Sequence, residues 1–412
     1  MNINKFIGST MILLGTTVGA GMLALPTVCA AAGFPMALAL MIFTWALATI
    51  TGIMVIEINL AFSTHACSFN TMAEQILGNF GKVITWISYL FLLYVITIAY
   101  ITGEADTVTT TLKLMLNIEL PNWSIAVLFT LILGMAVFWS TESVDYFNRG
   151  LMSLKGLLLI ITLALIMPHV DIIKLIAAQE TTTAKYLLVA APTFLTAFGY
   201  QFIVPSLRIY IGAKPKQLKW IVILGTSLAL LFYLLWLIAT LGTIPLTGEN
   251  SFVSWKQNHG SVGELTRIMT VIIHNKWVTS SVYGFANIAM TTSFLGVGLG
   301  LFDFLADGFK RSNTRWGRLQ TAGLTFLPPL LFALIYPKGF EKAVNCAGLF
   351  LAILTIILPA LMVYYLRKNP KLKSSYRMWG GNLLCVSVLI IGIVLAVLSI
   401  MTSFKLLPTL NN

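Results

Sequence analysis

The sequence predicts an all-α polytopic membrane protein with eleven transmembrane helices. Its 412 residues are 58% hydrophobic and only 10% charged, whereas soluble domains carry about 25% charged residues. The apolar segments are continuous and close to the roughly 20 residues that a helix needs to cross a bilayer, so they fit helices rather than the strands of an outer-membrane barrel. Two of these segments are interrupted near their middle by glycine.

Eleven apolar segments are expected to cross the membrane. Their approximate bounds are 6–31, 34–62, 82–103, 122–140, 149–168, 187–212, 219–243, 278–306, 319–336, 343–366 and 382–404. The first segment follows Lys5 and has the outline of a signal peptide, but its glycines and the many later spans favour a retained span. The longest loop is expected at 244–277, and no connection has room for a soluble domain.

The basic residues predict the orientation of these spans. Lys and Arg gather at 208–219, 310–318 and 367–377, and the span count places all three connections on the side of the N-terminus. Because positively charged loops stay inside, we expect a cytoplasmic N-terminus and a C-terminus on the opposite side. The positive-inside pattern also explains the net charge of +12, so no nucleic acid partner is inferred.

The first and sixth spans carry breaks at matching positions. The first span contains GTTVGAGMLALP, in which Gly19 precedes Pro26, and the sixth contains TAFGYQFIVPSL, in which Gly199 precedes Pro205. Each broken span opens a block of five spans, and because five is odd the second block enters the membrane upside down. This is the pattern of a five-plus-five inverted-repeat transporter. The expected units are a first repeat at 1–168, a second repeat at 187–366 and an additional helix at 382–404.

A break inside a span indicates a binding site. An unpaired backbone group costs several kcal/mol in hydrocarbon, so an unwound segment persists only where it is buried or lines a cavity. The freed N–H groups of the second half-helix attract a carboxylate, and the freed carbonyls of the first half-helix can receive an ammonium group. Tight helix packing would explain a single pair of glycines, but two matched breaks favour a site for an amino-acid zwitterion.

Few ionisable residues lie within the predicted spans, so each is a functional candidate. Lys155 either extends to the inner headgroups or is a buried amine that exchanges a proton during transport. Glu57 and Asp303, near the inner ends of their spans, are expected to form structural ion pairs with basic residues. Asp307 is a weaker candidate for a gate at the inner mouth.

The cysteines and histidines do not indicate a metal site. The cysteines are far apart in the sequence and the histidines fall in loops or at span ends; they are Cys29, Cys67, Cys346, Cys385, His65, His169, His259 and His274. We therefore expect neither a metal nor a cofactor. An intramembrane enzyme would need convergent catalytic groups at depth and a channel would need a continuous pore, so neither class is expected.

Several motifs together resemble the bacterial hydroxy/aromatic amino acid permeases, most closely the tyrosine-specific branch and next the tryptophan permeases. They are GTTVGAGMLALP, FNRGLMSLK, FGYQFIVPS, TTSFLGVGLGLFDFLAD, RSNTRWGRLQTAGLTFLPP and ALIYPKGF. The resemblance covers nearly the whole chain and is most specific between Thr291 and Phe340. It implies an amino acid–polyamine–organocation transporter with a LeuT-like fold.

The resemblance also implies an activity and partners. The expected activity is import of L-tyrosine, or another aromatic amino acid, with a proton through a bacterial inner membrane, so that the C-terminus would be periplasmic. The expected partners are the amino acid, the proton and membrane lipid. A tryptophan or serine/threonine permease of the same family, or an amino-acid exchanger, remains an alternative.

The resemblance carries roles onto particular residues. Thr17, Val18, Gly19, Ala20 and Gly21 would hold the carboxylate and part of the amine, and Thr196, Ala197, Phe198 and Gly199 would offer carbonyls to the amine. Phe198 and Tyr200 would cover the ring, and Thr292, Ser293, Tyr94, Thr97 and Tyr100 would form walls. Lys155 matches a lysine that occupies the cation position of sodium-coupled relatives. Gln201 stands where family members often have histidine. Because an amide cannot carry a proton, either that histidine is not the coupling residue of the family or coupling differs in this chain, and the position also bears on ring selectivity.

Overall fold

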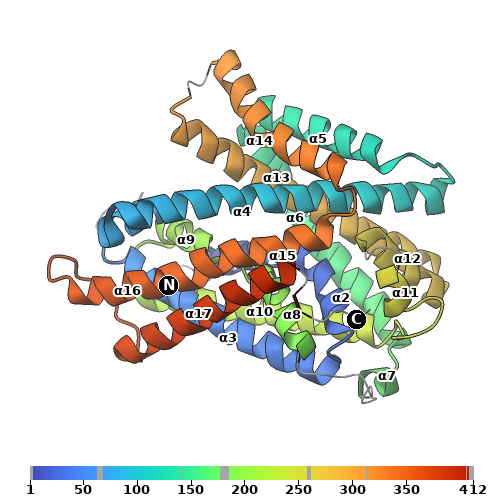
Figure 1. Cartoon of the computed structure of the whole chain (residues 1–412), viewed down its shortest axis with the longest axis horizontal. Coiled ribbons are helices and arrows are strands. Elements are labelled where there is room, and N and C mark those ends of the chain that lie inside the picture. The colour runs from blue at the N-terminus through green and yellow to red at the C-terminus, as the bar shows by residue number, and fades with distance from the viewer. Residues whose placement is uncertain are drawn as a thin grey trace.

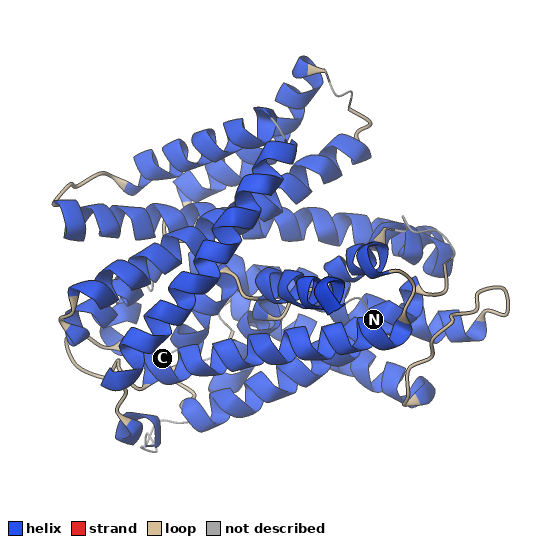
Figure 2. Ribbon diagram, turned by 180° about the vertical axis from the view of Figure 1, so that it is seen from behind, coloured by secondary structure: helices blue, strands red, loops and turns tan. Residues whose placement is uncertain are grey.

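Every regular element in the computed structural model is a helix among the residues that it describes, which are 3–62, 68–139, 141–176, 185–257, 261–311, 314–404 and 406–407 (Figures 1 and 2). The elements are α1 (Ile3–Thr17), η1 (Ala20–Ala24), α2 (Leu25–Cys29), α3 (Phe34–Asn59), α4 (Phe69–Leu116), α5 (Asn122–Trp139), α6 (Thr141–Ile166), η2 (Met167–His169), α7 (Ile172–Ile176), α8 (Lys185–Ala197), η3 (Gln201–Ile203), α9 (Val204–Ile211), α10 (Pro215–Leu241), α11 (Phe252–Gln257), α12 (Val262–Ile273), α13 (Lys276–Gly308), α14 (Arg315–Ile335), α15 (Phe340–Leu351), the π-helical η4 (Ala352–Ile357), α16 (Leu358–Lys368) and α17 (Gly381–Ser403).

The predicted number of spans agrees with these helices. Within the described ranges, 10 helices are long and apolar enough to cross a membrane, and the bent pair Ile3–Thr17 and Ala20–Cys29 brings the total to 11. The connected segments Tyr186–Ile211 and Phe340–Lys368 each form one span. The molecule is therefore the predicted all-α membrane protein, with a first and a sixth span that are discontinuous.

The first break lies at Val18 and Gly19. The Val18 N–H still donates to the Leu14 carbonyl at 2.8 Å, but Gly19 is extended, with φ −133° and ψ −160°. The two halves of the span are bent by 43°. Pro26 falls in the first turn of α2, where a missing N–H costs little, so the proline is compatible with a new helix after the break.

The second break covers Phe198 to Tyr200 and precedes η3 and α9. Pro205 lies in the first turn of α9, as Pro26 does in α2. The same combination of an unwound glycine segment and an N-terminal proline therefore builds both half-helices.

The third span is longer than predicted. Helix α4 runs from Phe69 to Leu116, with a kink at Gly78, whose φ of 69° suits glycine. The predicted span ended at residue 103 because polar residues follow it. The structure corrects this bound: the polar stretch stays helical because neighbouring helices bury Glu104 and Thr107.

The core surrounds the two broken spans. Helix α1 packs on α10, α2 packs on α8, and α13 packs on both α4 and α6. In Figure 1, α5 and α14 lie on one side of α4, while α3, α10 and α17 lie on the other. The short helices α11 and α12 gather at one end of the bundle, where α12 packs on α4.

Candidate functional site

A cavity of about 460 Å³ lies between the two breaks. Its walls come from both broken spans and from α4, α6, α13 and α15. The predicted residues that line it are Thr17, Gly19, Gly21, Tyr100, Thr196, Gly199, Tyr200, Thr292 and Ser293. Further lining residues, which sequence reasoning did not single out, include Tyr89, Ile96, Met152, Phe202, Ser206, Phe340 and Leu351. The volume suits a small organic molecule.

The other residues expected to contact the substrate lie outside this lining. They are Val18, Ala20, Tyr94, Thr97, Ala197, Phe198 and Gln201. The Tyr94 hydroxyl donates to the Leu324 carbonyl at 2.7 Å, a group left free by Pro328 in α14. The Thr97 hydroxyl donates to its own helix at Leu93. The i, i+3 spacing predicts that two side chains share a helix face, but it does not predict that this face lines the cavity.

The N-terminal end of the half-helix after the first break faces the cavity. The Ala20 N–H lies 3.4 Å from Ser293 Oγ, and the Tyr100 side chain also contacts Ser293. A Cβ atom on Gly19 would lie 3.1 Å from Ser293 Oγ, so glycine keeps this approach open. The backbone N–H groups and the Ser293 hydroxyl together form a donor set that suits a carboxylate.

Lys155 occupies the C-terminal end of the first half-helix. Its ammonium group donates to the Val18 carbonyl at 2.8 Å and to the Gly15 carbonyl at 3.3 Å, and the residue is 3% exposed. Extension to the headgroups is thereby excluded. The positive charge instead satisfies carbonyls that the break leaves free, at the negative end of a helix dipole.

Tyr233 of α10 joins the two breaks. Its hydroxyl lies 2.6 Å from the Thr17 carbonyl and 2.6 Å from the Ala197 carbonyl. The Phe198 ring packs edge-on against it, with centroids 5.1 Å apart. Ala197 and Phe198 therefore hold Tyr233 rather than the cavity. No sequence pattern singled out this tyrosine within an apolar span.

Gln201 caps the second break. Its side-chain oxygen accepts from the Tyr200 N–H at 2.9 Å, and its amide nitrogen donates to Thr51 Oγ1 at 3.0 Å. The Tyr200 hydroxyl donates to the Ala48 carbonyl at 2.9 Å, and a Cβ on Gly52 would lie only 2.0 Å from that hydroxyl. The amide thus ties the break to α3.

The cavity extends toward the end of the bundle that holds the N-terminus. Past the breaks, its lining continues to Tyr89, Ser206 and Gly300, which lie on segments that lead to the basic connections. At the opposite end, the hollow between Thr27 and Trp255 has a volume of only about 10 Å³. The structure is therefore open at one end and closed at the other.

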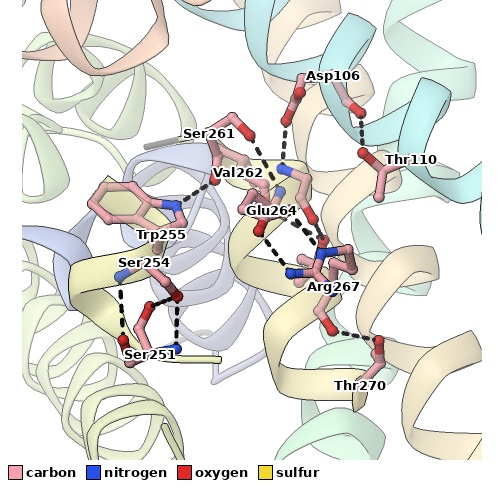
Figure 3. Close-up of polar contacts among 12 residues, drawn as sticks. Asp106, Thr110, Ser251, Ser254, Trp255, Ser261, Val262, Glu264, Arg267 and Thr270 are labelled. Atoms are coloured by element: carbon pink, nitrogen blue, oxygen red, sulfur yellow. Dashed lines mark hydrogen bonds and ion pairs between the residues drawn. The ribbon is translucent and has the colours of Figure 1, made fainter. Parts of the chain in front are cut away.

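Helices α11 and α12 close that opposite end. The Asp106 carboxylate accepts from the Gly263 N–H at 2.6 Å, in the first turn of α12, as Figure 3 shows beside the Glu264–Arg267 pair. Lys256 of α11 pairs with Glu341 of α15 at 2.9 Å. These contacts hold the helical loop against two different spans.

The remaining intramembrane carboxylates differ in their surroundings. Glu57 is buried in a two-pronged ion pair with Arg367, with both N–O distances 2.7 Å, and also accepts from the Met378 N–H. Asp303 and Asp307 are exposed on α13, and Arg318 is a charged neighbour of Asp303. Glu104, which sequence reasoning missed because it fell one residue beyond the predicted span, is 3% exposed.

The fold and the cavity define a class of protein, one with the LeuT-like fold of membrane transporters. Within the described ranges, no group of three His, Cys, Asp or Glu side chains is placed to hold a metal. The fold is similar to that of a manganese transporter of Eremococcus coleocola, with a TM-score of 0.66, 14% identity, and coverage of 97% of this chain and 86% of that one.

The chain belongs to the tryptophan/tyrosine permease family, whose family model matches residues 2–399. It is 37% identical to a tryptophan-specific transport protein of Pseudomonas aeruginosa, over 98% of this chain and 96% of that protein. It is 34% identical to the tyrosine-specific transport system 1 of Haemophilus influenzae, over 95% and 96%. The protein is therefore a multi-pass membrane permease of the aromatic amino acid class and not an enzyme.

Proposed function

We propose that the protein imports an aromatic amino acid, with L-tyrosine as the first candidate, by proton symport across the bacterial inner membrane. The observation that carries this proposal is the cavity between two breaks, because it brings carboxylate donors and carbonyl acceptors together in one apolar enclosure. In this proposal the N-terminus is cytoplasmic and the C-terminus periplasmic, as the distribution of basic residues indicates.

The proposed binding mode uses both breaks. The carboxylate meets the N–H groups that follow Gly19 and the Ser293 hydroxyl. The Thr196 carbonyl is the favoured acceptor for the ammonium group, because it lies between Gly21 and Gly199, 3.8 and 3.5 Å from where their Cβ atoms would be. The carbonyls of Thr17 and Ala197 already accept from Tyr233 in this conformation.

The ring is proposed to extend along α4. Ile96, Leu92 and Tyr100 line the cavity there, and Phe202 lies across from them. Burial of the substrate ring among such side chains supplies affinity. A protein hydroxyl that hydrogen-bonds to the phenol of tyrosine or the indole N–H of tryptophan would supply selectivity.

Lys155 is the proposed coupling residue. Its ammonium group bridges α6 to the carbonyls of the first break, so loss of its proton would weaken the link between two elements that must move. The four-helix bundle is proposed to rock against its scaffold, with 1–168 and 187–366 as the two repeats.

The driving force is adequate for concentrative uptake. A zwitterion that moves with one proton carries one net charge, which is worth about 2.3 kcal/mol per 100 mV. At about 1.36 kcal/mol per factor of ten, that gives roughly fifty-fold accumulation before any pH gradient.

Tryptophan is the second candidate substrate. The observation that favours it is the specificity of relatives: the Shigella flexneri protein, 35% identical over 98% of this chain, is a tryptophan-specific transport protein. The tyrosine proteins are about as similar, so overall identity does not separate the two substrates.

Uptake into proteoliposomes tests the proposal. We expect labelled tyrosine to accumulate on an imposed proton gradient and to be displaced by tyrosine or tryptophan but not by serine. The Gly19→Leu variant should lose binding while it still inserts, because the larger side chain enters the space beside Ser293. Accumulation that needs an opposing amino acid but no proton gradient would identify an exchanger instead.

A further inference from the structure

Glu104 is a carboxyl group buried in the transporter wall, and no charged side chain among the described residues pairs with it. It lies on α4 one turn outward from Tyr100, which lines the cavity. Its Oε1 atom lies 3.4 Å from the Thr291 hydroxyl of α13. Its Oε2 atom is buried and has no hydrogen-bond partner among the described protein atoms. Such a group is costly at this depth unless solvent reaches it.

A lane of polar side chains leads outward from Glu104 between α4 and α13. Thr107 and Thr111 follow it on α4 at helical spacing, and Asn287 lies one turn outward of Thr291 on α13. The Asn287 amide nitrogen donates to Thr111 Oγ1 at 3.2 Å. Its amide oxygen is buried and has no protein partner.

The lane continues to the helical loop at the closed end. Tyr283, one further turn outward on α13, lies beside the Thr266 and Thr270 side chains of α12. Its buried hydroxyl forms no hydrogen bond of standard geometry. Arg267 of α12 is partly exposed and thus connects this region to solvent. Unpaired polar atoms on successive turns provide the several partners that an internal water needs.

The charged side chains near Glu104 pair with other groups and not with its carboxylate. Among the described residues, the polar contact that its carboxyl group makes is the one with the Thr291 hydroxyl. Elsewhere on the surrounding elements, Asp106 faces α12, Lys338 acts on Asp106, and Arg267 pairs with Glu264. An ionised carboxylate with no cation beside it is strongly disfavoured in this setting. Glu104 therefore holds a proton in this conformation.

We propose that Glu104 is a second proton-binding group of the transporter, additional to Lys155, and that protons reach it from the outer side along the lane of Thr107, Thr111, Asn287 and Tyr283. This inference rests on the proposed proton symport. A proton adds to the carboxylate from the outer side, is still present in this conformation, and leaves on the cavity side only after the substrate has been released, so no other bond changes.

The Glu104→Gln variant tests the proposal, because glutamine keeps the shape and the contact with Thr291 while it cannot titrate. We expect counterflow exchange to be preserved. With one coupled charge lost, accumulation at an imposed 100 mV should fall about fifty-fold relative to the unmodified protein. Infrared spectra should lose the carbonyl band of a protonated carboxyl group. Glu119→Gln, which changes an exposed carboxylate paired with Lys113, is the matched control.

The possible results separate the two proposals. If the unmodified protein ignores proton gradients, the proposed symport fails, and the infrared band still reports whether Glu104 holds a proton. If the protein is proton-driven and Glu104→Gln accumulates substrate equally well, Glu104 is only structural. Asn287→Leu tests the route: it should slow proton-driven uptake without slowing counterflow, and an unchanged rate would remove the lane from the proposal.

Discussion

Lys155 shows how a single side chain can stabilise an interrupted helix. A break exposes carbonyl groups that would otherwise remain unpaired in an apolar environment. The Lys155 ammonium group satisfies two of them, at Gly15 and Val18, and Tyr233 satisfies the Thr17 carbonyl. The discontinuous span is therefore held by neighbouring helices even without a ligand. Because these links join separate elements, they are also suited to change when the elements move.

The Lys155→Met variant should lose uphill, proton-driven uptake and retain counterflow. Methionine has similar length but neither charge nor proton, and it leaves two carbonyls unpaired, at a cost of about 1–3 kcal/mol each. Accumulation at an imposed 100 mV should fall at least about fifty-fold, the contribution of one coupled charge. Lys216→Met, an exposed change in the first turn of α10, is the control. Undiminished accumulation in the Lys155 variant would exclude it as the coupling residue.

At the scale of elements, the loop of α11 and α12 closes the end opposite the N-terminus through polar contacts. The Asp106 carboxylate receives an N–H from the first turn of α12, where the helix dipole also favours a negative charge. The Glu264 carboxylate raises the pKa of Arg267, so the arginine of this loop stays charged. Lys256 and Glu341 add a half-exposed ion pair. Such contacts can release and re-form more readily than a large apolar interface.

Removing the Asp106 charge should loosen this loop. In Asp106→Asn the bond to Gly263 loses its ionic component, and a hydrogen bond to a charged group is worth about 1.5–3 kcal/mol. We expect faster hydrogen exchange at the α12 amides, measured by mass spectrometry. Asp171→Asn is the control, because that carboxylate accepts from nearby Ile173 and lies away from α12. Equal exchange in α12 of both variants would show that Asp106 does not hold the loop.

At the scale of the whole molecule, the described residues leave the cavity accessible from the end that holds the N-terminus and close it at the other. Its lining reaches Ser206 on the side of the N-terminus, whereas Thr27 borders a hollow of about 10 Å³ on the other side. Alternating access requires the open end to close and the closed end to open in turn. The structure therefore represents one of the two end states, in which the side bearing the basic loops is open.

Cysteine labelling tests this asymmetry. With the four native cysteines replaced, Ser206→Cys should react from the N-terminal side at least about tenfold faster than Thr27→Cys reacts from the other side, because a minor state is populated at about 10% or less. Saturating substrate should protect Ser206→Cys. The reverse order of rates would mean that the opposite end state predominates.

Much of the architecture follows from the sequence alone. Apolar length and low charge determine helices that cross a bilayer, because no other backbone arrangement satisfies its polar groups there, apart from a closed barrel. Gly19 with Pro26 and Gly199 with Pro205 determine where two of those helices break, because the proline restarts a helix that the glycine has interrupted. These local rules need no knowledge of neighbours.

Tertiary structure alone decided which side chains face the cavity and which complete the breaks. Tyr94 and Thr97 have suitable spacing but face elsewhere, and Gln201 is used within the fold. Tyr233 and Glu104 acquire their roles from helices distant in sequence. The physical reason is that periodicity specifies a helix but leaves its rotation open. The packing of the bundle sets that rotation, and with it the partner that each polar group finds.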